Sequence, residues 1–251
     1  DTGEFRSGQV KVDEGYEHWL LKFDGVSNNR DKELADPQGF GKIEYAYYLM
    51  ATEAGIDMSE CRLHHEGGRS HFMTRRFDRD ERGRKRHMQS LGAMQHFDFN
   101  DPASYSYEQA VLTIRDLGLG MDVVEQQYKR AVFNVVARNQ DDHVKNISFL
   151  MDRSGAWRLS PAYDVAYSYN PSGSWTRDHQ MSLAGKRNDF THGDLMVLAS
   201  NVGLKSNKAN QAIEDIVDAV AKWQEFAEQA GVEHSDVSRI EKTFRMNLRG
   251  K

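Results

Sequence analysis

Residues 139–146 read NQDDHVKN, and residues 161–165 read PAYDV. Within these stretches Asp141 precedes Asn146 by five residues, and Asp164 follows Asn146 by eighteen. Carboxylate and amide oxygens are the ligands that Mg²⁺ prefers. A carboxylate that binds no metal can instead accept a proton from a reacting group. The spacing therefore predicts a site that combines a general base with a hard metal ion.

A β-hairpin is predicted between the two stretches. Residues 147–152 and 156–160 are its arms, and residues 153–155 (RSG) form its turn. A strand rises about 3.3 Å per residue, so two arms of similar length bring the chain back to its starting point. We therefore expect Asp164 to lie near Asn146, although they are distant in sequence.

The chemistry that such a group of side chains suits is phosphoryl transfer from ATP. This reaction needs a carboxylate facing the acceptor hydroxyl and oxygen ligands for magnesium. Protein kinases space their catalytic loop Asp-x-x-x-x-Asn and place a second metal-binding Asp downstream. Asp141 is the predicted base for a Ser or Thr hydroxyl, and Asn146 and Asp164 are the predicted magnesium ligands. Asp142 stays an alternative base, although its spacing to Asn146 is one residue short.

Four further residues have both a functional and a structural interpretation. Lys22 ends an apolar strand, where it could bind ATP phosphates or extend to solvent. Glu44 opens the next helix and is the predicted carboxylate partner of Lys22. His143 could touch phosphate or support the loop. Lys145 could face the transferred phosphoryl group or be solvated.

Residues 1–88 predict a small α+β lobe. Residues 16–23 (YEHWLLKF) are typical of a strand, and the polar segment 24–42 predicts a long loop. A helix is predicted over residues 43–54, where apolar residues recur at helical spacing before Gly55. Further strands are predicted at 61–65, 70–74 and 86–88, and the basic stretch 75–86 leads to the second lobe.

Residues 89–251 predict a mainly helical lobe. Asp101-Pro102 is a predicted helix start, and Ser206 is a predicted N-cap. Apolar stripes predict helices over residues 121–138, 207–228 and 236–248. Together the two parts predict an α+β fold with a small β-rich N-lobe and a mainly helical C-lobe.

Composition narrows the classes of protein. A formal net charge of −5 gives no global argument for nucleic-acid binding. A single cysteine, Cys61, excludes an internal disulfide and suits a reducing compartment, so a cytoplasmic location is expected. No apolar run reaches the length of about 18 residues of a membrane span, and no membrane partner is expected. The chain starts with Asp1 rather than Met, and we expect further residues upstream.

These residues together resemble the kinase core of HipA-type proteins, the bacterial Ser/Thr kinases that act as toxins in toxin–antitoxin pairs. The resemblance rests on residues 19–23 (WLLKF), Glu44-Tyr45, residues 76–79 (RFDR), residues 141–146 (DDHVKN) and residues 161–165 (PAYDV). It implies a two-lobed, protein-kinase-like fold with ATP and Mg²⁺ in the cleft. A Gly-rich phosphate-binding loop would lie before residue 1.

The resemblance also implies roles for individual residues. It makes Asp141 the base, Asn146 and Asp164 the metal ligands, and Lys22 the ATP-phosphate lysine. It makes the loop 24–42 substrate-facing. It implies that the backbone of Arg75, Arg76 and Phe77 forms a hinge against adenine, with Gln89, His143 and Tyr163 as further nucleotide contacts.

Partners follow from the same resemblance. It implies a protein substrate such as an aminoacyl-tRNA synthetase, and a small antitoxin of helix-turn-helix type through which DNA is reached indirectly. Two other functions stay open. The chain could be an inactive kinase-like module that holds an antitoxin and DNA, or a small-molecule or lipid kinase, because Asp-x-His-x-x-Asn also resembles phosphoinositide kinases.

Overall fold

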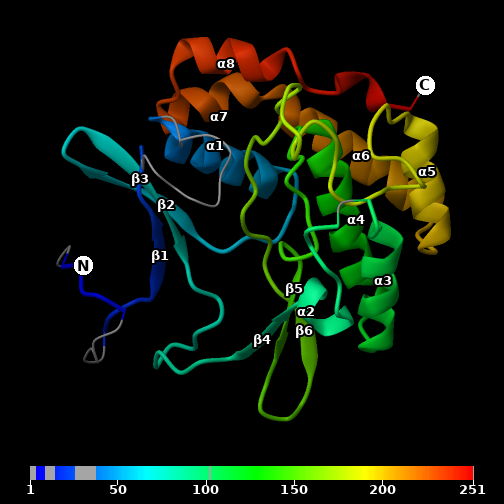
Figure 1. Cartoon of the computed structure of the whole chain (residues 1–251), viewed down its shortest axis with the longest axis horizontal. Coiled ribbons are helices and arrows are strands. Elements are labelled where there is room, and N and C mark those ends of the chain that lie inside the picture. The colour runs from blue at the N-terminus through cyan, green and yellow to red at the C-terminus, as the bar shows by residue number, and fades with distance from the viewer. Residues whose placement is uncertain (1–3, 9–14, 26–37, 102, 251) are drawn as a thin grey trace.

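The computed structural model describes residues 4–8, 15–25, 38–101 and 103–250, which form an α+β fold of two small antiparallel sheets and a set of helices (Figure 1). None of the described helices is long and apolar enough to cross a lipid bilayer. The strands are β1 (Trp19–Lys22), β2 (Cys61–Glu66), β3 (Arg69–Arg75), β4 (His87–Ser90), β5 (Ser148–Met151) and β6 (Trp157–Leu159). The helices are α1 (Phe40–Glu53), α2 (Leu91–Gln95), α3 (Tyr107–Asp116), α4 (Met121–Val136), α5 (His192–Asn201), α6 (Ser206–Ala221), α7 (Trp223–Ala230), α8 (His234–Glu241) and the 3₁₀ turn η1 (Met246–Leu248).

The first sheet has the order β1-β3-β2. Gly67 and Gly68 join β2 to β3 and both have positive φ, at 57° and 75°, which a two-residue hairpin turn of this kind requires. In the register Leu20 lies opposite Thr74, and Lys22 lies opposite Phe72. Side chains alternate between the faces of a strand, so these four residues share one face of the sheet.

Helix α1 lies very close to β3 at Gly41. A Cβ atom at this position would come within 2.7 Å of the Ser70 carbonyl oxygen and 3.2 Å of the Phe72 nitrogen. Both neighbours are backbone atoms, which cannot rotate away. The glycine therefore sets the distance between the helix that carries Glu44 and the sheet that carries Lys22.

The substitution Gly41→Ala is expected to lower the free energy of unfolding by about 1–3 kcal/mol, the usual cost of overpacking. The gain in helix propensity, about 1 kcal/mol, is too small to offset the backbone clash. The matched control is Gly193→Ala, which also alters the second residue of a helix. There the added Cβ meets only Thr191 Oγ1, at an ordinary 3.5 Å. Urea unfolding should show Gly193→Ala unchanged or stabilised; equal effects of the two variants would contradict the prediction.

The second sheet has the order β4-β5-β6 and contains the predicted hairpin, whose turn includes Gly155 at φ 87°. The strand predicted at residues 86–88 belongs to this sheet, because His87 to Ser90 pair with Met151 to Ser148. The predicted boundary after residue 88 therefore falls inside β4. The reason is that all four residues of β4 form antiparallel pairs with the four residues of β5.

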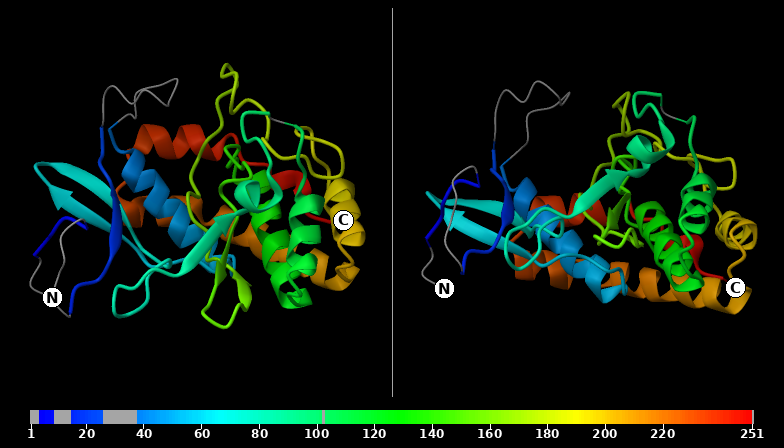
Figure 2. Two further views of the ribbon diagram at one scale, coloured as in Figure 1. Left: turned by 60° about the horizontal axis from the view of Figure 1, so that its bottom comes forward. Right: turned by 90° about the horizontal axis from the view of Figure 1, so that it is seen from below.

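One hydrophobic core joins α1 to the helices of the C-terminal half. Helix α1 packs against α6 and α7 as well as against β2 and β3, and α4 packs against α6. The fully buried Tyr47 contacts the rings of Phe133 and Trp223 at centroid distances of 6.1 and 5.6 Å, and its hydroxyl donates to the Ala137 carbonyl at 2.5 Å. Figure 2 shows α1 between the first sheet at one end of the molecule and α5 at the other.

Two predicted helix starts are wrong. The helix expected at Asp101-Pro102 begins at Tyr107, because Ser106 and Gln109 form a reciprocal capping box; position 102 lies outside the described residues. Ser206 is the first helical residue of α6 and not its N-cap, which is Lys205.

Two predicted helices are also divided. The helix predicted over 207–228 is broken at Lys222, where the chain turns so that Trp223 starts α7 facing α1. The helix predicted over 236–248 ends at Glu241. Arg245 then bonds the C-terminal carbonyls of α4 through its backbone nitrogen, to Val136 at 3.0 Å, and its side chain, to Val135 at 2.8 Å.

Candidate functional site

The loop between α4 and β5 holds Asp141 and Asn146 in a tight turn. The Asn146 side-chain Nδ2 donates to the Asp141 carbonyl at 2.9 Å, and the Asn146 backbone nitrogen donates to the His143 carbonyl at 2.9 Å. Nδ2 is thus directed into the loop, and the amide oxygen is the end that can face a cation. The spacing of five residues therefore has a local cause, since it is the length of the turn that this amide closes.

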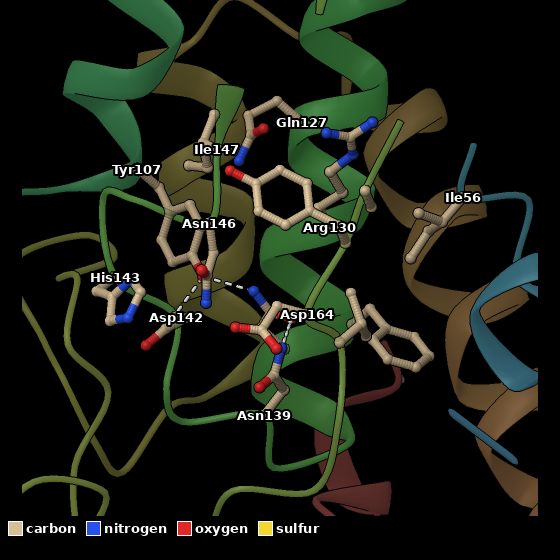
Figure 3. Close-up of a pocket in the computed structure, with 15 residues that line it drawn as sticks. Ile56, Tyr107, Gln127, Arg130, Asn139, Asp142, His143, Asn146, Ile147 and Asp164 are labelled. Atoms are coloured by element: carbon tan, nitrogen blue, oxygen red, sulfur yellow. Dashed lines mark hydrogen bonds between the residues drawn. The ribbon is translucent and has the colours of Figure 1, made fainter. Parts of the chain in front are cut away.

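Asp141 and Asp164 line the same cavity, with a volume of about 120 Å³, together with Lys22 and Glu44. The hairpin β5-β6 returns the chain as expected, and Asp164 and Asn146 line a second, smaller cavity of about 30 Å³ beneath the loop. Figure 3 shows Asn146, Asp142 and Asp164 approaching this smaller cavity opposite Gln127 and Arg130 of α4. The structure therefore brings Asp141, Asn146 and Asp164 together around these two cavities.

Asp142 has a different environment from Asp141. Its carboxylate is buried and accepts hydrogen bonds from the Tyr107 hydroxyl at 2.6 Å, His179 Nδ1 at 2.7 Å and the Gln180 backbone nitrogen at 2.7 Å. Burial raises its pKa, but the hydrogen bonds that the carboxylate accepts from His179, Tyr107 and Gln180 outweigh burial, so the pKa lies below its ordinary value. The Asp142 oxygens are occupied within the core, which leaves Asp141 as the carboxylate that faces the cavity.

His179 binds Asp142 as a neutral imidazole. Arg245 Nη1 lies 3.0 Å from His179 Nε2. A guanidinium has no acceptor atom, so Nε2 must accept and Nδ1 must carry the proton that is donated to Asp142. Burial lowers the pKa of Arg245 to about 10, which keeps it charged at neutral pH. The charge of Asp142 is therefore balanced by Arg245 across a neutral ring.

Lys22 bridges two carboxylates at the mouth of the cavity. Its Nζ lies 2.7 Å from Glu44 Oε1 and 2.5 Å from Asp164 Oδ1. Burial lowers the pKa of the ammonium, but the charges of Glu44 and Asp164 outweigh burial and raise the pKa above its ordinary value. The Glu44 side chain is only 3% exposed, whereas that of Lys22 is 48% exposed. Lys22 is therefore a permanently charged group fixed by a buried carboxylate.

Asp164 adopts a left-handed backbone conformation, with φ 56°. This region costs energy for most residues and is tolerated best by Asn and Asp. Strained backbone of this kind is concentrated at functional sites. The conformation directs the Asp164 carboxylate toward Lys22 at the edge of both cavities in the cleft.

A larger cavity of about 310 Å³ adjoins the first and shares Lys22, Glu44 and Asp164 with it. Its walls are mostly apolar and lie on the inner face of the first sheet and the segment that follows it. They include Leu20, Met58, Cys61, Phe72, Thr74, Phe77, Met88 and Val165. An apolar cavity that ends at a fixed cation suits a molecule with a flat apolar part and an anionic tail.

The predicted hinge lies on this cavity. Arg75, Arg76 and Phe77 all line it, and the Phe77 and Tyr163 rings are 5.6 Å apart. The Arg76 guanidinium binds Asp78 through two hydrogen bonds, at 2.8 and 2.5 Å, which fixes the segment. Gln89 is not among the lining residues; Met88 is, because neighbouring residues of β4 point to opposite faces.

The remaining predicted residues lie below or beside the cleft. Burial raises the pKa of Tyr163 to about 12, and its hydroxyl bonds the Lys145 carbonyl and, at 2.5 Å, Ser148 Oγ. The Lys145 ammonium is exposed and lies 3.1 Å from the centre of the Phe99 ring, away from the cavities. His143 lines the small cavity and has Nε2 3.7 Å from Asp141 Oδ1. Through these two hydrogen bonds Tyr163 ties the segment after the hairpin to the loop of residues 139–146 and to β5.

The predicted loop 24–42 is described only at its ends, because residues 26–37 lie outside the described residues. At the near end Asp24 is buried, its backbone nitrogen donates to His71 Nδ1 at 2.9 Å, and its Oδ1 accepts from the Gly39 nitrogen at 2.8 Å. Residues 40–42 are the first turn of α1 rather than loop.

Metal binding was predicted for Asn146 and Asp164, and their donor set fits a hard cation. Both offer oxygen, and magnesium is typically held by one or two protein carboxylates together with phosphate oxygens and water. In the described ranges, this cleft included, no group of three or more His, Cys, Asp or Glu side chains is arranged to hold a metal ion.

Sequence reasoning missed Gln140, Trp175 and His179. They surround Asp141 and Asp142: Trp175 Nε1 donates to Asp141 Oδ1 at 2.9 Å, and Gln140 Nε2 donates to the Arg177 carbonyl at 2.8 Å. No local pattern marks them, because their partners lie more than thirty residues away in the chain.

Comparisons with known proteins give the family and the fold of this chain. The model of the family described as HipA-like C-terminal domain matches residues 5–224. A Haemophilus influenzae protein named "Putative kinase" is 24% identical over 234 residues, which cover 82% of this chain and 68% of that protein.

Two solved structures share the fold. One is a chain of the Shewanella oneidensis MR-1 toxin–antitoxin complex of HipA, HipB and operator DNA, with a TM-score of 0.68, 16% identity and coverage of 98% of this chain and 65% of that one. The other is the Helicobacter pylori proinflammatory kinase CtkA, with a TM-score of 0.52, 12% identity and coverage of 92% and 89%. This chain thus spans less than two thirds of the Shewanella chain. These matches confirm the predicted two-lobed kinase-like fold, and the chain belongs to the HipA-like C-terminal domain family.

Proposed function

We propose that this chain is the core of an ATP- and Mg²⁺-dependent Ser/Thr protein kinase. The observation that carries the proposal is the arrangement around the cleft. Asp141 and Asp164 line one cavity, and the Lys22–Glu44 pair joins it to an apolar cavity of about 310 Å³. A base, a metal-binding oxygen, a fixed cation and an apolar pocket in this order are the parts that phosphoryl transfer requires.

Each part has one task in the proposed reaction. The apolar cavity holds the adenine ring against the hinge formed by residues 75–77, and Lys22 binds phosphate oxygens. A magnesium ion held by Asn146 and Asp164 would supply charge neutralisation at the phosphates. Asp141 accepts the proton of the acceptor hydroxyl as its oxygen bonds to the γ-phosphorus. The bond from that phosphorus to the bridging oxygen breaks, and ADP leaves with that electron pair.

We further propose that the two lobes, predicted as residues 1–88 and 89–251 and joined through β4, meet around this nucleotide. Among the remaining predicted residues, His143 supports the loop from beneath and Tyr163 contacts the nucleotide from the floor of the cavity. Lys145 would reach the transferred phosphoryl group only by leaving Phe99, since it lines neither cavity of the cleft as described.

The replacement Lys22→Met tests the phosphate-binding role. A hydrogen bond to a charged group is worth about 1.5–3 kcal/mol, so affinity for Mg-ATP should fall by about 10–150-fold in calorimetry. The buried Glu44 also loses the positive charge of Lys22, so the double variant Lys22→Met/Glu44→Gln should recover stability without recovering ATP affinity. Lys42→Met is the control, because Lys42 lies on the helix that carries Glu44 and, in the part of the chain that the structure describes, is ion-paired with the exposed Glu233 at 4.0 Å. Unchanged ATP affinity in Lys22→Met would refute the assignment.

The acceptor and the partner are proposed from the family. We propose a protein substrate such as an aminoacyl-tRNA synthetase, and a small helix-turn-helix antitoxin that carries the complex to DNA. The support is the solved Shewanella complex, which contains HipA, HipB and operator DNA. The direct test is transfer of labelled phosphate from Mg-ATP to proteins of a lysate, with lipids and small hydroxylated molecules as competing acceptors. A full-length protein that binds no ATP would instead be a binding module.

A further inference from the structure

Three consecutive residues of the catalytic loop are bonded to one short segment, residues 175–180. Gln140 Nε2 donates to the Arg177 carbonyl at 2.8 Å, Asp141 Oδ1 accepts from Trp175 Nε1 at 2.9 Å, and Asp142 accepts from His179 and Gln180. Residues 140, 141 and 142 are therefore each bonded to a different part of this segment. This segment begins eleven residues after Asp164.

The segment has a fixed base. His179 and Gln180 are buried, and Arg245 and Asn188 extend their network into the core through bonds of 3.0 and 2.8 Å. Gln180 Nε2 donates to the Trp175 carbonyl. Gln140 Nε2 donates to the carbonyl of Arg177, two residues further along the chain. The segment that carries the indole and the loop that carries Asp141 are thus held by the same buried residues, Gln140, His179 and Gln180.

The Trp175 N–H is the hydrogen-bond donor that the described residues offer to the Asp141 carboxylate. His143 Nε2, at 3.7 Å from the same oxygen, is beyond hydrogen-bond distance. A carboxylate that could rotate freely would spend little time in the orientation that a hydroxyl needs, and holding a group in place contributes to rate. The indole fixes Oδ1 and therefore the rotation of the whole carboxylate.

The same contact leaves the carboxylate able to act. An ionised carboxylate has about four acceptor positions on its two oxygens, and Trp175 occupies one of them on Oδ1. Oδ2 is the oxygen that remains for the acceptor hydroxyl, and the Asp141 side chain is still 37% exposed toward the cavity. An N–H donor suits this task because, unlike a hydroxyl, it cannot itself receive the phosphoryl group.

We propose that Trp175 is a positioning residue, whose indole N–H orients the Asp141 carboxylate so that Oδ2 faces the acceptor hydroxyl. The inference rests on the proposed kinase function and adds a residue to it. It assigns residues 175–180 the task of holding the base in place. Gln140 and Asp142, on either side of Asp141, fix the loop to this segment through their own hydrogen bonds.

The test is Trp175→Phe, which keeps an aromatic ring and removes the N–H. A tenfold effect on rate corresponds to about 1.4 kcal/mol of transition-state stabilisation. We expect kcat to fall about tenfold while the KM for ATP stays unchanged, because Trp175 lines neither cavity of the cleft as described. The matched control is Trp157→Phe, the same change on the edge strand β6, which should leave kcat unaltered.

A second readout is independent of activity. In ¹H–¹⁵N spectra of indole-labelled protein, the Trp175 N–H resonance should move in Asp141→Ala, whereas the Trp157 resonance should not. A Trp175 resonance unmoved in Asp141→Ala, or equal kcat in wild type and Trp175→Phe, would overturn the positioning role alone. A raised kcat in Trp175→Phe would also overturn it, because the indole would then obstruct the acceptor. A wild type that binds ATP and transfers no phosphate to any acceptor would overturn the proposed function first.

Discussion

Asp141→Asn is expected to lower kcat for phosphoryl transfer by about 10²–10⁴-fold, the usual contribution of a general base. The substitution keeps the size of the side chain, and the amide oxygen can still accept the Trp175 N–H. What is lost is the ability to take the proton of the acceptor hydroxyl. The structure argues for this residue over its neighbour because Asp141 lines the cleft cavity, whereas the Asp142 oxygens are bonded inside the core.

Affinity for Mg-ATP should stay close to that of wild type in Asp141→Asn, because phosphate binding is assigned to Lys22 and magnesium binding to Asn146 and Asp164. The control is Asp152→Asn, an exposed aspartate that bonds Ser154 and Ala156 in the hairpin turn. Initial rates should be measured with labelled ATP at saturating magnesium, together with calorimetry for binding. Equal transfer by wild type and Asp141→Asn would show that the base has been assigned to the wrong residue.

Asp142→Asn is expected to lower the free energy of unfolding by about 3–5 kcal/mol, the cost of removing one partner from a buried charged network. The new amide NH₂ would face the His179 N–H, so that two donors point at each other. Arg245 would lose the negative charge that balances it across the imidazole. Urea unfolding at pH 7, followed by circular dichroism, gives the difference directly.

The pH dependence of this difference follows from the direction of the pKa shift. The pKa of Asp142 in the folded protein lies below its ordinary value of 3.8. Such a group contributes stability at pH values above the unfolded pKa and loses that contribution as pH falls through the folded pKa. The stability gap between wild type and Asp142→Asn should therefore be full at pH 7 and shrink below about pH 4.

Asp152→Asn again serves as the control, because it removes the charge of an exposed aspartate and should change stability far less. A gap between wild type and Asp142→Asn that is as small as the gap for Asp152→Asn would contradict the buried network. A gap that widened as the pH fell would contradict the direction of the pKa shift.

The parts of the fold that the sequence predicted well depend on short-range patterns. The hairpin that returns the chain to Asp164 is marked by two apolar arms around a turn with Gly155, and α4 is marked by an apolar stripe. The α+β kinase-like class follows from the order of these elements and is confirmed. Residues 22 and 44 were predicted to pair from the end of a strand and the start of a helix, and the structure places Nζ and Oε1 2.7 Å apart.

The parts that were missed depend on partners far away in the chain. Nothing near Asp142 signals that it binds Tyr107 and His179, which lie 35 and 37 residues away. The break at Lys222 appears only when Trp223 packs against α1. Likewise β4 was predicted to belong to the first sheet, because its own sequence does not indicate which strand it will pair with. In the structure it pairs with β5.

The attachment of α1 to the core limits how this protein could be switched. In many kinases the helix that bears the lysine-binding glutamate swings outward to turn the enzyme off. Here that helix carries Glu44 and, one turn later, the buried Tyr47, whose ring contacts Phe133 and Trp223 and whose hydroxyl donates to the Ala137 carbonyl. Rotating it would open the interior of the molecule. Under the proposed kinase function, inhibition is therefore expected to act by blocking the cleft or by withholding a component that binds at its edge. Helix α1 would stay in place.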